Sequence, residues 1–188
     1  TLVNLAACAE NSVGSPQGLS PNTLFPEREY IRQSLKKGVT AMRVEEIRTV
    51  ACLGTGTMGH GVAFLAAKAG YAVRLFGCSK ESLDKGFAGL DRAIALYEDN
   101  QLMPKGEGEA IKSRITPVTS LEEASAGADL VMESVAESVE VKQQTFSIVE
   151  RHCNPKAILA TNTSGLSLSA ISSTLARPEY VLSIHFFS

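Results

Sequence analysis

The chain lacks an excess of charge of one sign, and it lacks any long hydrophobic run. Its 188 residues include 18 Lys and Arg and 20 Asp and Glu, with the two signs interspersed, and the formal net charge is −2. Nucleic acids and anionic membrane surfaces select strongly basic proteins. The longest apolar runs fall far short of the ~20 residues that a transmembrane helix needs. We therefore expect no nucleic-acid partner and no membrane partner.

Cysteine is scarce, and its spacing excludes the common metal and redox motifs. The four cysteines are Cys8, Cys52, Cys78 and Cys153, and no two of them form a C-x-x-C pair. That spacing is typical of zinc sites and of thiol-redox centres. We therefore expect no metal site, and we expect Cys52, which lies in an apolar segment, to pack in the core.

A glycine-rich stretch is the most informative feature that is present. Thr49–Gly61 reads TVACLGTGTMGHG, so a short apolar segment runs into G-x-G-x-x-G and then into a helix-forming segment. This order of strand, glycine turn and helix is typical of dinucleotide binding. Gly54 permits the sharp turn, Gly56 lets the backbone approach a pyrophosphate, and Gly59 lets the helix pack on the strand. A purely structural glycine turn is the alternative.

Strand-like and helix-like segments alternate over most of the chain. The expected strands are Arg48–Leu53, Ala72–Phe76, Ile115–Val118, Asp129–Ser134, Ala157–Ala160 and Tyr180–Phe186. The expected helices are Val62–Ala69, Ser82–Tyr97, Glu109–Ser113, Leu121–Ala126, Val139–Cys153 and a helix through Leu168 and Leu175. This alternation predicts an α/β fold of the Rossmann type, doubly wound, with a mainly parallel sheet and a helical insertion after the second strand.

The first 46 residues differ from the rest. Proline, glycine and serine give this segment many turn signals, and Glu27–Lys37 is the one stretch expected to form a short helix. We interpret residues 1–46 as an extension or linker and residues 47–188 as the dinucleotide-binding domain. Because Pro117 lies within the third strand, we expect that strand at an edge of the sheet or at a strand end.

Ligands bind parallel sheets of this type at the carboxyl ends of the strands. Glu137 follows the fourth expected strand, Ser164 follows the fifth, and His185 lies in the last. We expect these three side chains to converge beside the cofactor crevice. A carboxylate, a hydroxyl and a histidine near a nucleotide suit hydride transfer with assistance from a general base.

With these residues in view, the sequence resembles the L-3-hydroxyacyl-CoA dehydrogenases, which include the 3-hydroxybutyryl-CoA dehydrogenases. The resemblance covers Ile47–Phe187. It is carried by the order and spacing of five motifs: GTGTMGHG, DLVMESVAE ending at Glu137, Val141-Lys142, Thr161-Asn-Thr-Ser164 and Ile184-His-Phe-Phe187. The resemblance implies an oxidoreductase of fatty-acid metabolism and β-oxidation that uses NAD, with a cytoplasmic location, or the mitochondrial matrix in a eukaryote.

The resemblance also implies roles for individual residues. His185 would be the catalytic base that takes the proton of the substrate 3-hydroxyl, and Ser164 would hydrogen-bond near the nicotinamide and that hydroxyl. Glu137 and Lys142 would hold the cofactor near the nicotinamide ribose, and Asn162 would contribute to the cofactor and substrate pockets. Thr57 and Met58, within the glycine loop, complete the expected cofactor contacts.

Each assignment has a simpler structural alternative. Ser164 and Asn162 are also residue types that cap helices. Glu137 and Lys142 are also compatible with a solvated surface pair. His185 is also compatible with a satisfied histidine of the core.

The sequence departs from the family pattern at Gly77 and after the His-Phe-Phe motif. Gly77 stands where the family has the acidic residue that binds the adenosine ribose, so NADP is an alternative to NAD, with Ser79, Lys80 and Arg74 as candidate partners of a 2′-phosphate. After the His-Phe-Phe motif comes Ser188, whereas the family continues to a glutamate that orients the histidine and to a helical domain that forms the dimer. We therefore expect the 188-residue polypeptide to bind nucleotide but to turn over slowly or not at all.

Three alternatives for the biological role remain open at this point. The substrate thioester is carried either by CoA or by an acyl carrier protein. Residues 1–46 either join this domain to another module, as in multifunctional β-oxidation enzymes, or form an unrelated leader. A non-catalytic nucleotide-binding or crystallin-like protein on the same scaffold is the alternative from another functional class.

Overall fold

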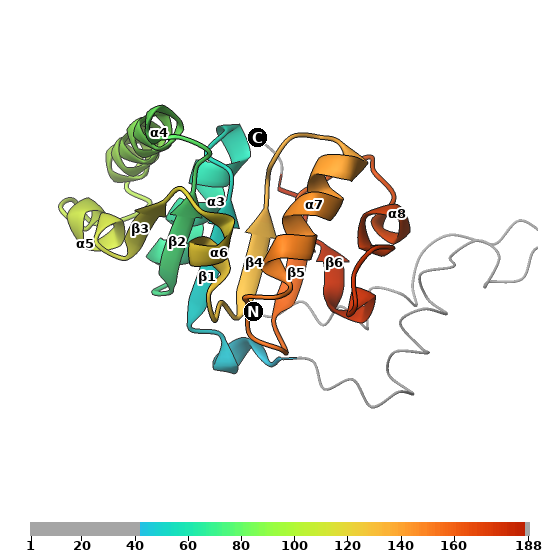
Figure 1. Cartoon of the computed structure of the whole chain (residues 1–188). Coiled ribbons are helices and arrows are strands. Elements are labelled where there is room, and N and C mark those ends of the chain that lie inside the picture. Colours follow the sequence, from blue (N-terminus) through green and yellow to red (C-terminus); the bar gives the residue numbers. More distant parts are fainter. Residues whose placement is uncertain (1–41, 187–188) are drawn as a thin grey trace, which may run out of the picture. The chain divides into compact units, whose positions relative to one another are not determined.

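The computed structural model describes residues 42–186, which lie in one compact unit. The helix expected over Glu27–Lys37 lies outside the described residues. A six-stranded sheet forms the centre of the unit, with the strand order β3-β2-β1-β4-β5-β6, and every neighbouring pair is parallel. The chain therefore reverses its direction of travel across the sheet between β1 and β4 (Figure 1).

The strands agree in order and number with those expected from the sequence. They are β1 Thr49–Leu53, β2 Ala72–Phe76, β3 Ile115–Val118, β4 Leu130–Glu133, β5 Ile158–Thr161 and β6 Val181–Ser183. The expectation of an edge strand at Pro117 is confirmed, because β3 comes first in the strand order of the sheet, with β2 as its neighbour. Proline lacks a backbone donor, so the sheet tolerates it at an edge.

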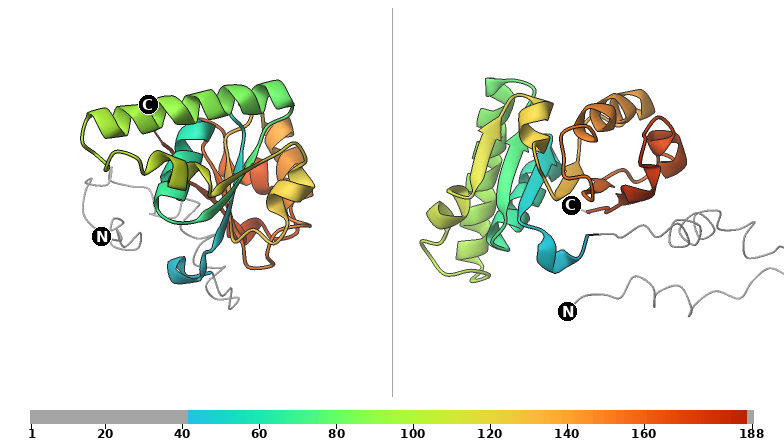
Figure 2. Two further views of the ribbon diagram at one scale, coloured as in Figure 1. Left: turned by 90° about the vertical axis from the view of Figure 1, so that its left-hand side faces the viewer. Right: turned by 60° about the horizontal axis from the view of Figure 1, so that its bottom comes forward.

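Helices cover both faces of the sheet, as expected for a doubly wound fold. The α-helices are α3 Thr57–Lys68, α4 Lys80–Asp99, α5 Gly108–Lys112, α6 Leu121–Ser125, α7 Val139–Val149 and α8 Leu168–Ser172, with short 3-10 helices at Val44–Glu46 and Pro178–Tyr180. α3 and α4 pack together on one side, whereas α6, α7 and α8 lie together on the other (Figure 2). The predicted helical insertion after β2 consists of α4 and α5.

The alternation of side chains along the central strand divides the core into two clusters. Val50 and Cys52 of β1 face the cluster under α3 and α4. Ala51 and Leu53 face the cluster that contains Phe146 of α7. All these side chains are almost completely buried, because the sheet is covered on both faces.

Two element boundaries differ from the expected ones in ways that matter for the site. Helix α3 begins at Thr57, inside the glycine loop, instead of at Val62. The last strand ends at Ser183, so His185 lies beyond the strand and not within it. The amide of Ile184 still donates to the carbonyl of Thr161 in β5 at 3.0 Å, whereas the amide of Phe186 donates to the side chain of Asn162 at 2.7 Å.

No helix within residues 42–186 is long and apolar enough to span a membrane. The same part of the chain contains no cluster of three or more histidine, cysteine or acidic side chains that would hold a metal ion.

Candidate functional site: a dinucleotide crevice at the carboxyl edge of the sheet

Each of the three glycines of the fingerprint is explained by a different feature of its surroundings. Gly54 has a φ of +112°, and a side chain there would lie 2.5 Å from the carbonyl oxygen of Ser134. A side chain at Gly59 would overlap the carbonyl oxygen of Gly54, so both positions require glycine for the fold itself. At Gly56, by contrast, a Cβ would meet no atom within 4 Å. The fold therefore leaves open space at the glycine that the fingerprint places beside the pyrophosphate.

The first turn of α3 presents uncapped amide groups. Gly56 is the N-cap residue and supplies no side-chain hydrogen bond. Four other helices have a serine at this position that accepts a hydrogen bond from a first-turn amide: Ser79, Ser120, Ser138 and Ser167. The amides of Thr57 and Met58 are thus available to an anionic group, and the helix dipole favours negative charge at this end. These residues fit the phosphates of a dinucleotide.

A buried ion pair lies directly behind the crevice. Glu133, the last residue of β4, and Lys142 of α7 are 0% and 1% exposed, and the Nζ of Lys142 donates to Oε1 of Glu133 at 2.7 Å. The same carboxylate accepts hydrogen bonds from the amide of Val135 at 2.7 Å and from Oγ1 of Thr161 at 2.6 Å. Every charged group in this cluster has partners, which a buried charge requires. Lys142 is therefore not half of a solvated surface pair.

Glu137 connects this cluster to the open side of the crevice. Its Oε2 lies 3.2 Å from the Nζ of Lys142, and its Oε1 accepts a hydrogen bond from Oγ1 of Thr163. Partial burial alone would raise the pKa of Glu137. The hydrogen bonds from Thr163 and Lys142, together with the positive charges of Lys142 and His185, outweigh burial, so its pKa lies below the ordinary value.

Asn162 positions the segment that carries His185. Its side-chain Oδ1 accepts a hydrogen bond from the backbone amide of Phe186. The backbone amide of Asn162 donates to the carbonyl oxygen of Glu133 at 2.9 Å. His185 and Ser164 are both exposed. His185 is therefore not a histidine of the core. Helix α8 is capped by Ser167, and so neither Ser164 nor Asn162 is its N-cap.

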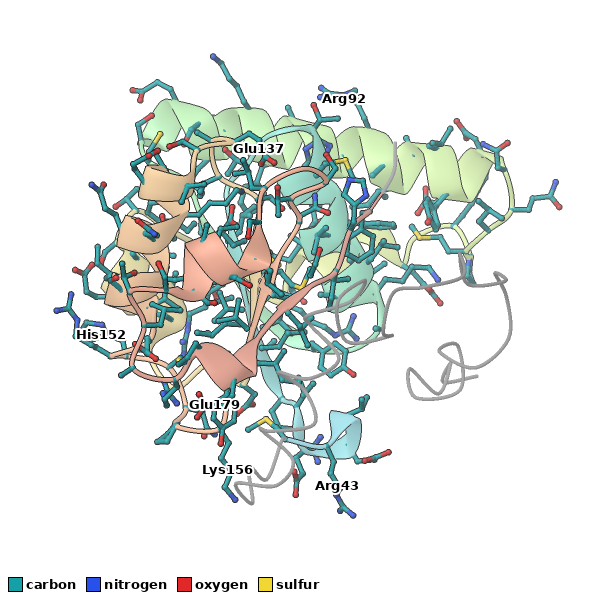
Figure 3. All side chains as sticks on the ribbon, turned by 90° about the vertical axis from the view of Figure 1, so that its right-hand side faces the viewer. Arg43, Arg92, Glu137, His152, Lys156 and Glu179 are labelled. Carbon is teal, nitrogen blue, oxygen red and sulfur yellow. The ribbon has the colours of Figure 1, made fainter. Side chains whose placement is uncertain are left out.

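Six of the predicted site residues line a single pocket of about 230 Å³. Its lining consists of Gly56, Thr57, Met58, Ser134, Val135, Glu137, Lys142 and Asn162. The other predicted site residues, Gly54, Gly59, Ser164 and His185, are not part of the lining. Figure 3 shows Glu137 at the same end of the molecule as Arg92, with Lys156 and Glu179 at the opposite end. A larger hollow of about 460 Å³, lined by Glu98 and residues 101–105, lies after α4 and contains none of the predicted site residues.

Four residues of the site were given no individual role by the sequence patterns: Glu133, Ser134, Thr161 and Thr163. A carboxylate inside an otherwise apolar strand was the available signal for Glu133, because a buried acid requires a partner. Its lysine lies nine residues away, on the next helix. The two threonines belong to the neighbouring strand and its loop, so their role depends on the order of strands in the sheet.

The adenosine end of the crevice departs from the usual pattern. Gly77 is buried at the end of β2, and a Cβ there would lie 2.5 Å from Oγ of Ser82. Of the three candidate partners of a 2′-phosphate, Ser79 caps α4, Lys80 pairs with Asp84 and Arg74 donates to backbone carbonyls at the end of α6. All three side chains thus have partners within the protein.

Comparison with known proteins gives the family. The model of the family described as "3-hydroxyacyl-CoA dehydrogenase, NAD binding domain" matches residues 49–188. The chain belongs to the 3-hydroxyacyl-CoA dehydrogenase family. NAD is the cofactor of this domain, as the resemblance implied.

Individual relatives agree with this family membership. The chain is 37% identical over 142 residues to a 3-hydroxyadipyl-CoA dehydrogenase of Escherichia coli K12. This alignment covers 76% of the chain and 30% of that protein. A crystal structure of a 3-hydroxybutyryl-CoA dehydrogenase from E. coli K12 superposes with a TM-score of 0.70, at 37% identity, over 75% of this chain and 30% of that one.

A third relative aligns further along the chain. It is the fatty acid oxidation complex subunit alpha of Psychrobacter arcticus, which is 31% identical over 184 residues, or 97% of this chain and 25% of that subunit. This alignment includes residues that precede the 3-hydroxyacyl-CoA dehydrogenase domain. The chain thus spans less than a third of the length of any of these three relatives.

Proposed function

We propose that the chain holds NAD for the oxidation of an L-3-hydroxyacyl-CoA thioester to the 3-ketoacyl thioester. The observation that carries the proposal is the pocket in which the glycine loop meets Glu137, Lys142 and Asn162. The names of the relatives support acyl-CoA as the substrate class. An acyl-carrier-protein thioester is the finer alternative, and a comparison of the two thioesters as substrates tests it.

Different residues of the site are assigned to cofactor binding and to proton transfer. The amides of Thr57 and Met58 would bind the phosphates of NAD, and Glu137, which is held by Lys142, would accept a hydrogen bond from a ribose hydroxyl. Bound NAD supplies the acceptor for the hydride that leaves the carbinol carbon of the substrate. His185 takes the hydroxyl proton as the carbon–oxygen double bond forms, and Ser164 donates a hydrogen bond to the same oxygen.

The negative charge of Glu137 supports this role for His185. Partial burial would raise the pKa of the Glu137 carboxyl, but the hydrogen bonds from Thr163 and Lys142 lower it below the ordinary value. Glu137 is consequently ionised at neutral pH, and its negative charge attracts the positive charge that His185 acquires when it takes the substrate proton. His185 lies on a backbone segment that Asn162 holds at Phe186.

We further propose that residues 1–46 connect this domain to another module of a multifunctional β-oxidation protein. The support is the alignment with the Psychrobacter arcticus subunit, which extends over 97% of the chain. Expression of a longer polypeptide from the same gene, followed by assay of a second β-oxidation activity, tests this proposal. A gene that encodes no further module upstream would contradict it.

Nucleotide binding by the 188-residue chain is the direct test of the function. NADH is titrated against the wild type and the Gly56→Ala variant, and binding is followed by fluorescence or calorimetry. The added methyl occupies space that is empty in the protein and is expected to weaken NADH binding about tenfold or more, because it lies where the pyrophosphate approaches. The unfolding free energy is expected to change by less than about 1 kcal/mol.

Gly61→Ala is the matched control, because Gly61 lies on the same helix and its Cβ would also meet no atom within 4 Å. This variant should bind NADH as the wild type does. Equal loss of affinity in both variants, or no NADH binding by the wild type, contradicts the proposed cofactor site. Because the 188-residue chain is expected to turn over slowly or not at all, the role of the histidine is tested in a longer polypeptide from the same gene. Reduction of acetoacetyl-CoA is compared there between the wild type and His185→Gln.

A further inference from the structure

Ser134 has a buried hydroxyl group without a hydrogen-bond partner. Among the side-chain nitrogen and oxygen atoms of residues 42–186, its Oγ is the one atom that is buried and unpaired. Burying a hydroxyl without a partner costs free energy, so native structures rarely keep one unless something else supplies the bond. The carboxylate of the preceding residue, Glu133, is fully satisfied and is not that partner.

The backbone of Ser134 lies at the point where the sheet reverses its strand order. Its amide donates to the carbonyl of Leu53 at 2.8 Å, which continues the pairing of β4 with β1 by one residue. Its own carbonyl oxygen lies beside Gly54, where a Cβ would come within 2.5 Å. Ser134 therefore adjoins the start of the glycine loop, in the crevice where open α/β sheets bind dinucleotides.

The pocket itself places Ser134 on the nicotinamide side of that crevice. Ser134 shares the lining with Gly56 and Thr57, which face the phosphates, and with Glu137 and Asn162, which come from the β4 and β5 side of the sheet. The adenosine ribose is expected at the end of β2, on the opposite side of β1.

We propose that the hydroxyl of Ser134 exchanges a hydrogen bond with an oxygen of the phosphate–ribose bridge on the nicotinamide side of the bound dinucleotide. This inference rests on the proposed function, because it needs the cofactor in the crevice. A phosphate or ribose oxygen is the partner that this otherwise unpaired hydroxyl lacks.

The test compares three ligands on the 188-residue chain. NADH and ADP-ribose both contain the bridge, whereas 5′-AMP reaches only the adenosine side. In Ser134→Ala, we expect the affinities for NADH and for ADP-ribose to fall about 3- to 10-fold, the range for loss of one hydrogen bond. The affinity for 5′-AMP should stay unchanged, and the melting temperature of the free protein should not fall, because the free protein loses no hydrogen bond.

Ser169→Ala is the control, since Ser169 is an exposed serine of α8 and is not part of the pocket lining. It should leave all three affinities unchanged. Unchanged NADH affinity in Ser134→Ala overturns the inference, as does an equal loss for NADH and 5′-AMP together with a lower melting temperature. A wild type that binds no NADH contradicts the proposed function as well, and the two failures are thereby distinguished.

Discussion

The Nζ of Lys142 lies 2.7 Å from Oε1 of Glu133, and both side chains are almost completely removed from water. The pair joins β4 to α7 directly behind the pocket, and Lys142 reaches on to Glu137 at 3.2 Å. A buried ion pair adds little net stability compared with an apolar pair, but the loss of one partner leaves the other charge buried and unpaired. Glu137 is therefore held in position by a cluster whose disruption would greatly lower the stability of the protein.

Removal of the lysine should destabilise the protein strongly. We expect Lys142→Met to lower the unfolding free energy by about 3 kcal/mol, because the carboxylate of Glu133 stays buried without its cation. The double variant Lys142→Met/Glu133→Gln should recover part of the loss, since no buried charge remains. Urea denaturation of the single and double variants measures both effects. The exposed Lys156→Met should change stability by less than about 0.5 kcal/mol, and an equal cost at both lysines would contradict the prediction.

Two glycines of the same helix should respond in opposite directions to alanine. In Gly59→Ala, the new methyl overlaps the carbonyl of Gly54, and we expect a loss of about 3 kcal/mol in unfolding free energy. In Gly61→Ala, the methyl meets no atom within 4 Å, and the better helix former should stabilise the protein by about 0.5–1 kcal/mol. Thermal or chemical denaturation gives both values. Similar stability of the two variants would show that α3 does not pack against the glycine loop as described.

The contribution of Glu137 to stability should depend on pH in a defined direction. Its pKa is lowered in the folded state, so the ionised form is favoured by folding. The contribution is complete above the ordinary pKa of 4.5 and is lost as the pH falls through the lowered folded value. The stability difference between the wild type and Glu137→Gln should therefore be present at pH 7 and disappear in the acid range.

Unfolding curves between pH 7 and pH 3 measure this difference. Glu179→Gln is the control, because the structure describes no hydrogen bond or ion pair of that side chain, and its effect on stability should be small throughout. A stability difference for Glu137→Gln that grows as the pH falls would contradict the assignment.

The three described cysteines should differ sharply in reactivity. Burial raises the pKa of the Cys52 thiol to about 12, and burial also raises that of Cys153, whereas Cys78 is exposed. Thiol reagents attack the thiolate and need access, so Cys78 should react and Cys52 should not. Mass spectrometry of alkylated protein identifies the sites, and a Cys8→Ser variant removes the cysteine that lies outside the described residues.

Cys78 follows Gly77 at the expected adenosine end of the crevice, so bound NADH should slow the alkylation of Cys78. Rapid labelling of Cys52 would contradict the buried β1 strand.

Much of the fold could be predicted from the sequence because local patterns encode it. The apolar run before Gly54 and the helix-forming segment after it specify a strand, a turn and a helix without information from elsewhere in the chain. The alternation of such segments predicted all six strands in their order along the chain. The pocket residues Glu137, Lys142 and Asn162 followed from motif spacing in the family that the chain resembles, and the structure places them together.

What the sequence by itself determined is the glycine loop, the alternation of strands and helices and the family. Only the tertiary structure decided how the polar side chains share their hydrogen bonds. Thr161 meets Glu133 across 28 residues of sequence because β4 and β5 are neighbours in the sheet. Beyond the end of β6, the side chain of Asn162 accepts the amide of Phe186, the residue after His185, and Ser167 rather than Ser164 caps α8. Periodicity reports which face of an element is buried, whereas contacts between distant residues depend on the order and register of the strands.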